Sequence, residues 1–181
     1  FFRETKNPFI GVVIGLVFTG IVHASAIPVS ILIILGQQGL INIENALPIV
    51  LGANIGTTVT AIMGAAVTNI NGKRTALAHL LFKFFGVTSS LVFFPIFVIS
   101  VKYLSTDIAQ QIAFGHFLLN LFIAVVFIFL LQPFSKLVEI IIPGTDHTFP
   151  LWPEFLEEKY LATPDEALIC VKKNWEEKSC S

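Results

Sequence analysis

The sequence predicts an all-α integral membrane protein, with a re-entrant helical hairpin followed by three membrane-spanning helices. This fold class rests on how few residues are charged and on where those charges lie. The 181-residue chain is 55% hydrophobic and 13% charged, about half the charged share of soluble domains. Between Pro8 and Gly72 only Glu44 is charged, and between Ile108 and Ser135 no residue is. Apolar stretches of this length indicate a bilayer rather than a globular core.

The net charge and the ends of the chain narrow the class of protein further. The formal net charge is −1, which argues against the basic surface of a nucleic-acid-binding protein. The chain starts at Phe1 with no signal-peptide pattern, so we expect a piece of a longer chain. Cys170 and Cys180 lie in the polar tail, where we expect free cytoplasmic thiols.

The first element, residues 9–41, is the predicted re-entrant hairpin. Its arms, Phe9–Val22 and Val29–Ile41, are about 14 and 13 residues long, shorter than the roughly 17 to 25 residues of a spanning helix. The segment His23–Pro28 between them is small and polar and ends in a helix breaker. Such a tip survives at membrane depth only where protein or a wet cavity surrounds it. One bent, over-long spanning helix is the alternative.

Three segments that follow are apolar and long enough to span. They cover residues 46–67, 76–101 and 108–131, separated by a turn at 42–45, a polar loop at 68–75 and a turn at 102–107. The hairpin returns to the side it entered from, and three crossings follow it. Lys73 and Arg74, in the polar loop after the first crossing, are therefore on the same side as the C-terminal tail, which follows the third. The positive-inside rule makes that side cytoplasmic, against the opposing charges of Arg3 and Lys6.

Polar residues inside these apolar segments are costly, so each is a candidate for a functional site. Two clusters qualify: the hairpin tip with His23 and Ser25, and the string Gly52-Ala53-Asn54-Ile55-Gly56-Thr57-Thr58-Val59-Thr60. The glycines let the helix unwind, and the carbonyls freed by unwinding, with amide and hydroxyl oxygens, suit a hard cation such as sodium. Amide groups freed at the start of a half-helix suit an anion. The alternative is that the threonines bond back to their own helix or join helices.

The string resembles the type II sodium/phosphate cotransporter family, whose halves each carry a Gln-Ser-Ser-Ser hairpin followed by Gly-Ala-Asn-Ile-Gly-Thr-Thr. The resemblance covers roughly Phe9 to Pro133, and the order of elements is similar to the second of two inverted repeats. It implies one half of an inverted-repeat transporter with a broken helix. Both halves would build one phosphate and sodium site near the midplane. The first repeat, in the same protein or in a second chain, is therefore an expected partner, and a homodimer stays open.

The resemblance, which Asn54, Gly56, Thr57 and Thr58 match directly, and the other polar residues of these segments together predict two overlapping sets of site residues. The set for phosphate is His23, Ser25, Asn54, Gly56, Thr57 and Lys83. The set for sodium, the coupling ion, is Ser25, Asn54, Thr57, Thr58 and Thr60, and no other cofactor or metal is expected. The tip departs from the family pattern, because His23 replaces glutamine and Ala24 and Ala26 replace serines. This departure leaves open how many sodium ions are coupled and whether sodium is required.

Lys83 is a second departure, because asparagine is usual at the matching place in the family. It lies about 12 Å inside its helix, where it could extend to the interface or face the core beside His79. If it faces the core, we expect a fixed positive charge that replaces a bound cation or holds phosphate directly. Two segments of the chain share a pattern, which we call the internal echo: Ala76–Lys83 and Ala113–Asn120. In this pattern Asn120 takes the place of Lys83, and each follows a histidine by one turn, His116 and His79 respectively.

From Pro133 the composition becomes soluble, and we expect residues 136–181 to form a cytoplasmic tail after a transporter repeat at 1–135. Leu161–Leu168 resembles the linker that leads, in bacterial members of the family, into a PhoU-like helical domain, of which about one helix is present. A plain amphipathic tail is the alternative.

The sequence therefore predicts a secondary transporter of the cell membrane that carries inorganic phosphate with sodium by alternating access. Two alternatives stay open: a non-transporting membrane sensor or regulator of phosphate with a degenerate site, and a symporter for another oxyanion. An enzyme is least expected, because no nucleophile–base pair is visible.

Overall fold

The computed structural model describes residues 7–144 and, beyond them, residues 165, 168, 169 and 172. Residues up to Gly144 form one compact unit, and the described residues after it are helical and belong to a second. The predicted tail therefore lies mostly outside the described residues. In the first unit the helices are α1 (Pro8–Val22), α2 (Ala26–Gln37), α3 (Ile43–Gly56), α4 (Thr58–Ala65), α5 (Ile70–Val92), α6 (Phe94–Leu104) and α7 (Ile108–Ile141). The all-helical prediction is confirmed for the residues that the structure describes.

The two predicted arms are the separate helices α1 and α2. Asn7 caps α1, because its side chain accepts a hydrogen bond from the Phe9 N–H at 3.0 Å. The helix ends at His23, whose backbone is left-handed with φ 62° and whose N–H donates to the Thr19 carbonyl at 2.7 Å. A left-handed residue turns the chain, so α2 starts in a new direction. That the pair enters and leaves a membrane on one side stays a prediction.

The first predicted span is the helix pair α3–α4, which only Thr57 interrupts. Asn42 caps α3 by accepting a hydrogen bond from the Asn45 N–H at 3.2 Å. The predicted turn at 42–45 is therefore the first turn of this helix. From Ile43 to Ala65 the pair is long and apolar enough to cross a membrane, and more than half of it is buried inside the protein. It is the central helix of the unit.

The predicted polar loop at 68–75 is wrong, because α5 already begins at Ile70. The Asn69 side chain caps it by accepting a hydrogen bond from the Gly72 N–H at 3.0 Å. The two basic residues of that segment therefore lie in the first turns of α5. One of them, Arg74, donates to the carbonyls of Ile142 and Gly144 at 3.1 and 2.8 Å, which ties α5 to the end of α7.

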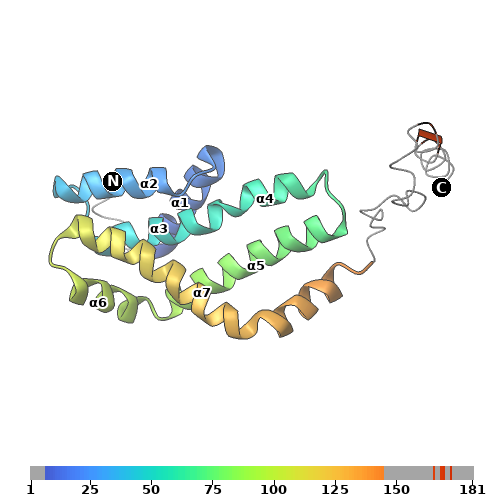
Figure 1. Ribbon diagram of the computed structural model, residues 1–181. Helices are drawn as coiled ribbons and strands as arrows, with labels where there is room; N and C mark the ends of the chain where they lie inside the picture. The colour runs from blue at the N-terminus through green and yellow to red at the C-terminus, as the bar shows by residue number, and fades with distance from the viewer. Residues whose placement is uncertain (1–6, 145–164, 166–167, 170–171, 173–181) are drawn as a thin grey trace. The chain divides into compact units, whose positions relative to one another are not determined.

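The single helix predicted over 76–101 is also wrong, because the chain breaks at Phe93 between α5 and α6. The break follows from Pro95, which has no N–H and whose ring clashes with the carbonyl four residues earlier. In contrast, α7 continues through Pro133 to Ile141, well beyond the predicted end at residue 131. Figure 1 shows that α7 changes direction along its length, as a helix with an internal proline does.

Glycines bring α1 and α3 into close contact. A Cβ atom added at Gly52 would overlap the Val12 carbonyl, and one added at Gly15 would overlap the Ile49 carbonyl. Gly11 lies against Pro48, farther toward the start of both helices, so the two helices run in the same direction. Small residues spaced four apart are the usual means by which helix backbones approach closely in membranes.

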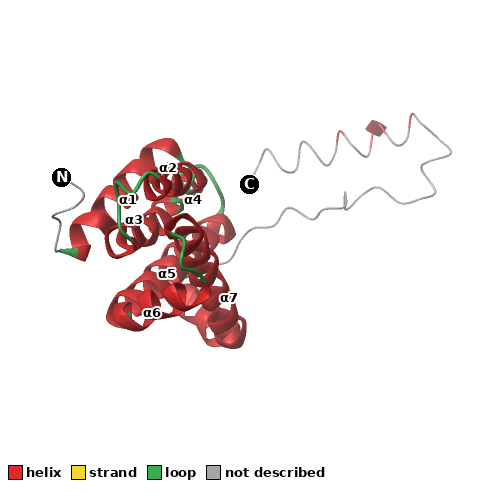
Figure 2. Ribbon diagram, turned by 90° about the vertical axis from the view of Figure 1, so that its left-hand side faces the viewer, coloured by secondary structure: helices red, strands yellow, loops and turns green. Residues whose placement is uncertain are grey.

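One end of the unit collects the end of α2, the start of α3, the end of α6 and the start of α7. Gly36 lies against Ile108 and Ile112, and Lys102 forms an ion pair with Glu44. In Figure 1 this end is at the left, and the turn between α4 and α5 is at the right. Turned by 90° in Figure 2, α1 to α4 lie above α5 to α7. The centre of α3 thus lies between the hairpin on one side and α5 and α7 on the other.

Candidate functional site

The end of α1 lies beside the interruption between α3 and α4. A Cβ atom added at Gly56, the last residue of α3, would lie 2.7 Å from both the Leu16 carbonyl oxygen and the Thr19 Cβ. On the other side of the interruption, a Cβ added at Gly20 would lie 3.4 Å from a Val59 methyl group. The structure therefore places the end of the first arm, one turn before the hairpin tip, beside the interruption.

The interruption is a single residue, not a long unwound segment. The Thr57 hydroxyl donates to the Asn54 carbonyl at 2.8 Å, the Thr58 hydroxyl to the Ile55 carbonyl at 2.8 Å, and the Thr60 hydroxyl to the Thr57 carbonyl at 2.9 Å. The threonines thus bond back to their own helix, which was the open alternative. The expected unwinding of the helix is limited to Thr57, and the three carbonyls each accept a threonine hydroxyl.

Bonding back to the helix still leaves the threonines able to hold a cation. A hydroxyl that gives its proton to a carbonyl keeps oxygen lone pairs as acceptors. Thr58 is buried, Thr57 is half-buried and Thr60 is exposed, so the three oxygens lie at different depths. Thr57 and Thr58 remain the better placed candidates for an enclosed site.

At the hairpin tip, the backbone rather than side-chain bonds fixes the two candidate residues. His23 owes its position to the left-handed turn after α1, and its side chain is exposed. Ser25 is half-buried and precedes α2, but its hydroxyl makes no capping bond to that helix. Within the described part of the chain, neither side chain makes a hydrogen bond, so both keep their donors and acceptors for a ligand.

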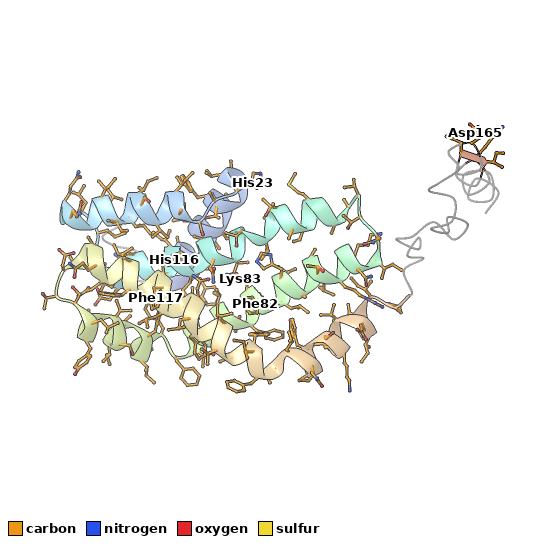
Figure 3. The ribbon with its side chains drawn as sticks, viewed as in Figure 1. His23, Phe82, Lys83, His116, Phe117 and Asp165 are labelled. Atoms are coloured by element: carbon orange, nitrogen blue, oxygen red, sulfur yellow. The ribbon has the colours of Figure 1, made fainter. Side chains whose placement is uncertain are left out.

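Lys83 faces the interior of the unit rather than an end. Its Nζ donates to Asn54 Oδ1 at 2.7 Å and to Asn120 Oδ1 at 2.9 Å, so the ammonium joins α5 to α3 and α7. Figure 3 shows Lys83 in the middle of the unit, well away from both ends. The sequence left open whether Lys83 extends to the membrane interface or faces the core, and in the structure it faces the core. Asn120, which the internal echo matched to Lys83, is its direct partner.

Two buried polar atoms near the centre of the unit have no hydrogen-bond partner among the described residues. They are Asn54 Nδ2 and Thr19 Oγ1, and Asn54 and Thr19 are only 2% and 0% exposed. A buried polar atom without a partner is uncommon in proteins, and one cause is a ligand or ion that completes it. Nothing in the sequence singles out Thr19, because it lies within an apolar arm. Only its spacing, one turn before the tip, marks it.

The chemistry available at this place is that of amides, hydroxyls and one amine. In the parts of the chain that the structure describes, no group of three histidine, cysteine, aspartate or glutamate residues lies close enough to hold a metal ion. The donors and acceptors present suit an oxyanion and a hard monovalent cation.

The sequence model of the Na+/Pi-cotransporter family matches residues 2–128 of this chain. The uncharacterized protein YqeW of Bacillus subtilis is 38% identical over 131 residues, which are 72% of this chain and 43% of that protein. YjbB of Escherichia coli, named for inorganic phosphate export, is 29% identical over 167 residues, 91% of this chain and 30% of that protein. The human sodium-dependent phosphate transport protein 2B is 38% identical over 89 residues, 49% of this chain and 13% of that protein. No solved structure matches.

The chain spans less than half the length of each of these relatives, at 43%, 30% and 13%. The family match nevertheless covers the hairpin, the interrupted helix, α5, α6 and most of α7, which hold every predicted site residue. Three helices among the described residues are long and apolar enough to cross a membrane, as a membrane transporter requires. The chain therefore belongs to the Na+/Pi-cotransporter family, a family of transporters rather than enzymes.

Proposed function

We propose that the protein containing this chain is a secondary transporter that carries inorganic phosphate with sodium across a cell membrane by alternating access. The observation that carries the proposal is the packing of the end of α1, just before the hairpin tip, against α3 and α4 at the interruption at Thr57, with Lys83 and two amides on the other side of the same helix. Interrupted helices near the middle of a bundle are where secondary transporters bind their substrates.

For phosphate, the proposed ligands are His23, Ser25, Asn54, Gly56, Thr57 and Lys83. Phosphate needs donors and positive charge, and Lys83 supplies an ammonium with a third proton beyond its two bonds. Asn54 Nδ2 is a buried donor without a partner in the described part of the chain. Gly56 contributes by its lack of a side chain, which lets the end of α1 pack against the interruption.

For sodium, the proposed ligands are the side-chain oxygens of Ser25, Asn54, Thr57, Thr58 and Thr60, of which the Asn54 oxygen already accepts a hydrogen bond from Lys83. The threonine hydroxyls donate to the helix and so present lone pairs, which is the orientation that a cation needs. We propose that another repeat, in the same protein, a second chain or a homodimer, completes both sites. We also propose that the turn between α4 and α5 and the C-terminal tail lie on the cytoplasmic side. Lys73 and Arg74 lie directly after that turn, and the positive-inside rule favours the cytoplasm for them.

The test is uptake of radiolabelled phosphate into proteoliposomes that hold the intact protein, with an inward sodium gradient or with choline in place of sodium. We expect uptake that requires sodium. Phosphate efflux is measured as well, because one relative is named for export and alternating access is reversible. A protein that moves no phosphate in either direction under any gradient would be a sensor or regulator, and the transport proposal would be wrong. Competition by arsenate, sulfate and molybdate shows whether another oxyanion is preferred.

A matched pair of variants locates the site within this assay. Thr57→Ala removes a hydroxyl that donates to the carbonyl three residues before it, and Ser100→Ala removes one that donates four residues back in α6. We expect Thr57→Ala to need roughly tenfold more sodium for half-maximal uptake, the size of one lost bond to a charged group. Ser100→Ala should behave like the unchanged protein. Equal effects of the two changes would place the site elsewhere.

A further inference from the structure

The surroundings of Lys83 differ from those of an ordinary buried lysine. Lys83 is half-buried and lies in an apolar helix, yet among residues 7–144 no carboxylate lies within ion-pair distance of its Nζ. Glu44, the acidic residue within the α3–α4 span, pairs with Lys102 at the end of the unit. An ammonium at membrane depth is costly, and a carboxylate is its usual partner. Among the described residues, two neutral amide oxygens and the Phe82 ring, whose centroid lies 5.7 Å from Nζ, surround it instead.

Those neutral oxygens are turned toward the ammonium by the rest of their side chains. Asn120 Nδ2 donates to the His116 carbonyl at 2.8 Å, so its oxygen faces Lys83. Asn54 also offers its oxygen to Lys83, although its own amide nitrogen is then buried without a partner in the described part of the chain. Two amide oxygens from two different helices thus converge on one positive charge.

Converging amide oxygens without a counter-charge are also the surroundings that a sodium ion takes in proteins. The ammonium is tethered to α5, whereas a sodium ion has to be captured from solution at each cycle. A ligand that is part of the chain is present at every sodium concentration. It also adds a positive charge that stays in the membrane through the transport cycle.

We propose that the Lys83 ammonium is a tethered cation that occupies a position otherwise taken by one coupling sodium ion. The proposal rests on phosphate transport by this protein and specifies the part that Lys83 plays in it. Asn54 and Asn120 then form a cation site that Lys83 fills permanently. Phosphate transport by this protein consequently couples one sodium ion fewer than it does with a neutral residue at position 83.

The first test measures sodium binding and does not depend on transport. The intact protein, Lys83→Asn and Lys83→Gln are purified in detergent without phosphate, and their melting temperatures are followed from choline chloride to sodium chloride at constant ionic strength. Each substitution should free the two amide oxygens and add a third. We expect each variant to gain a sodium-dependent rise of roughly 5 to 10 °C when sodium is about a hundredfold above its dissociation constant.

Lys102→Asn is the matched control, because it removes a lysine from an apolar helix at the end of the unit, outside the proposed site. It should show the same sodium response as the unchanged protein. Two variants at position 83 guard against one that does not fold. If both fold and neither responds to sodium more than Lys102→Asn does, the tethered-cation proposal is wrong.

The second test separates this inference from phosphate transport itself. In proteoliposomes, Lys83→Asn should lose about tenfold in uptake at low sodium. It should recover at high sodium with a Hill coefficient for sodium larger by about one. A loss that no sodium concentration recovers would mean that Lys83 acts on phosphate alone and takes no sodium position, which overturns the proposal. If the unchanged protein moves no phosphate, the transport proposal fails, and the melting temperatures still decide whether Lys83 occupies a cation site.

Discussion

At the scale of single residues, the two ends of the Asn54 amide have unequal surroundings. Its Oδ1 accepts a charge-assisted hydrogen bond from Lys83 at 2.7 Å, while its Nδ2 is buried with no partner among the described residues. Its backbone carbonyl accepts from Thr57 at 2.8 Å. One residue therefore touches the lysine on one side and the interruption of its helix on the other. Asn54 thus contacts the proposed cation position through its side chain and the Thr57 hydroxyl through its backbone carbonyl.

A double-mutant cycle measures how strongly Asn54 and Lys83 depend on each other. Asn54→Leu keeps a side chain of similar size but leaves the ammonium with one acceptor, and should cost about 2 kcal/mol of unfolding free energy. Adding Lys83→Met removes the charge, so the double variant should regain part of that loss. Denaturant unfolding in detergent gives the four free energies. Losses that simply add would show that the two side chains do not stabilise each other.

At the scale of elements, the sequence predicted those helices whose ends depend on a few neighbouring residues. The two short arms, the tip and the interruption near Thr57 follow from segment length and from glycine and proline. The start of α5 was missed although its signal was present, because Asn69 precedes Ile70 as a helix-capping residue should. The polar composition of that segment was taken for a loop.

Other errors arose because proline acts differently in different surroundings. Pro95 separates α5 from α6, whereas Pro133 lies inside α7. A proline removes one backbone bond in either case, and whether the helix continues depends on what packs around it. The direction in which Lys83 points could not be predicted from the sequence either, because it also depends on what packs around the residue. Its partners lie 29 and 37 residues away, and only the internal echo connected one of them, Asn120, to it.

The close contact of α1 with α3 should depend on the absence of a side chain at Gly52. Gly52→Ala adds a methyl group that overlaps the Val12 carbonyl, so the hairpin must move away from α3. We expect a loss of about 1 to 3 kcal/mol in unfolding free energy, and weaker phosphate uptake because the tip moves with α1. Melting temperature and uptake measure the two effects.

Gly64→Ala in α4 is the control for this change, because no heavy atom lies within 4 Å of the added methyl group. It should leave uptake unchanged and leave stability equal or higher by up to ~1 kcal/mol, the helix preference of alanine over glycine. If the two alanines change the unfolding free energy by the same amount, the close packing of α1 on α3 contributes little to stability.

At the scale of the whole unit, polar and charged residues gather at its two ends and at the centre. The Glu44–Lys102 ion pair lies at one end, and Lys73 and Arg74 lie at the other, where α5 begins. Between them the outward faces are apolar: Phe9, Ile21, Ile99 and Phe129 are among the exposed side chains. The central polar group around Lys83 is thus separated from both ends by apolar side chains, as a site near the middle of a membrane would be.

The re-entrant hairpin makes a definite prediction about which residues face which side of the membrane. Asn7 precedes α1 and Gln38 follows α2, and both are exposed. If the pair enters and leaves on one side, cysteines at these two positions react with a membrane-impermeant maleimide from the same side. One bent spanning helix would place them on opposite sides. Cys170 and Cys180 are first replaced by serine, so that each variant carries one cysteine within this chain.

Two further cysteines calibrate the labelling in right-side-out and inside-out vesicles. Tyr103→Cys, at the end of α6 that carries the Glu44–Lys102 ion pair, should react from the same side as Gln38→Cys. Lys73→Cys, at the start of α5, should react only from the other side, which the positive-inside rule makes cytoplasmic. Reaction of Asn7→Cys together with Lys73→Cys would mean that α1 and α2 cross the membrane as one unit. The tip then could not lie at membrane depth beside Thr57, and the proposed site would lose His23 and Ser25.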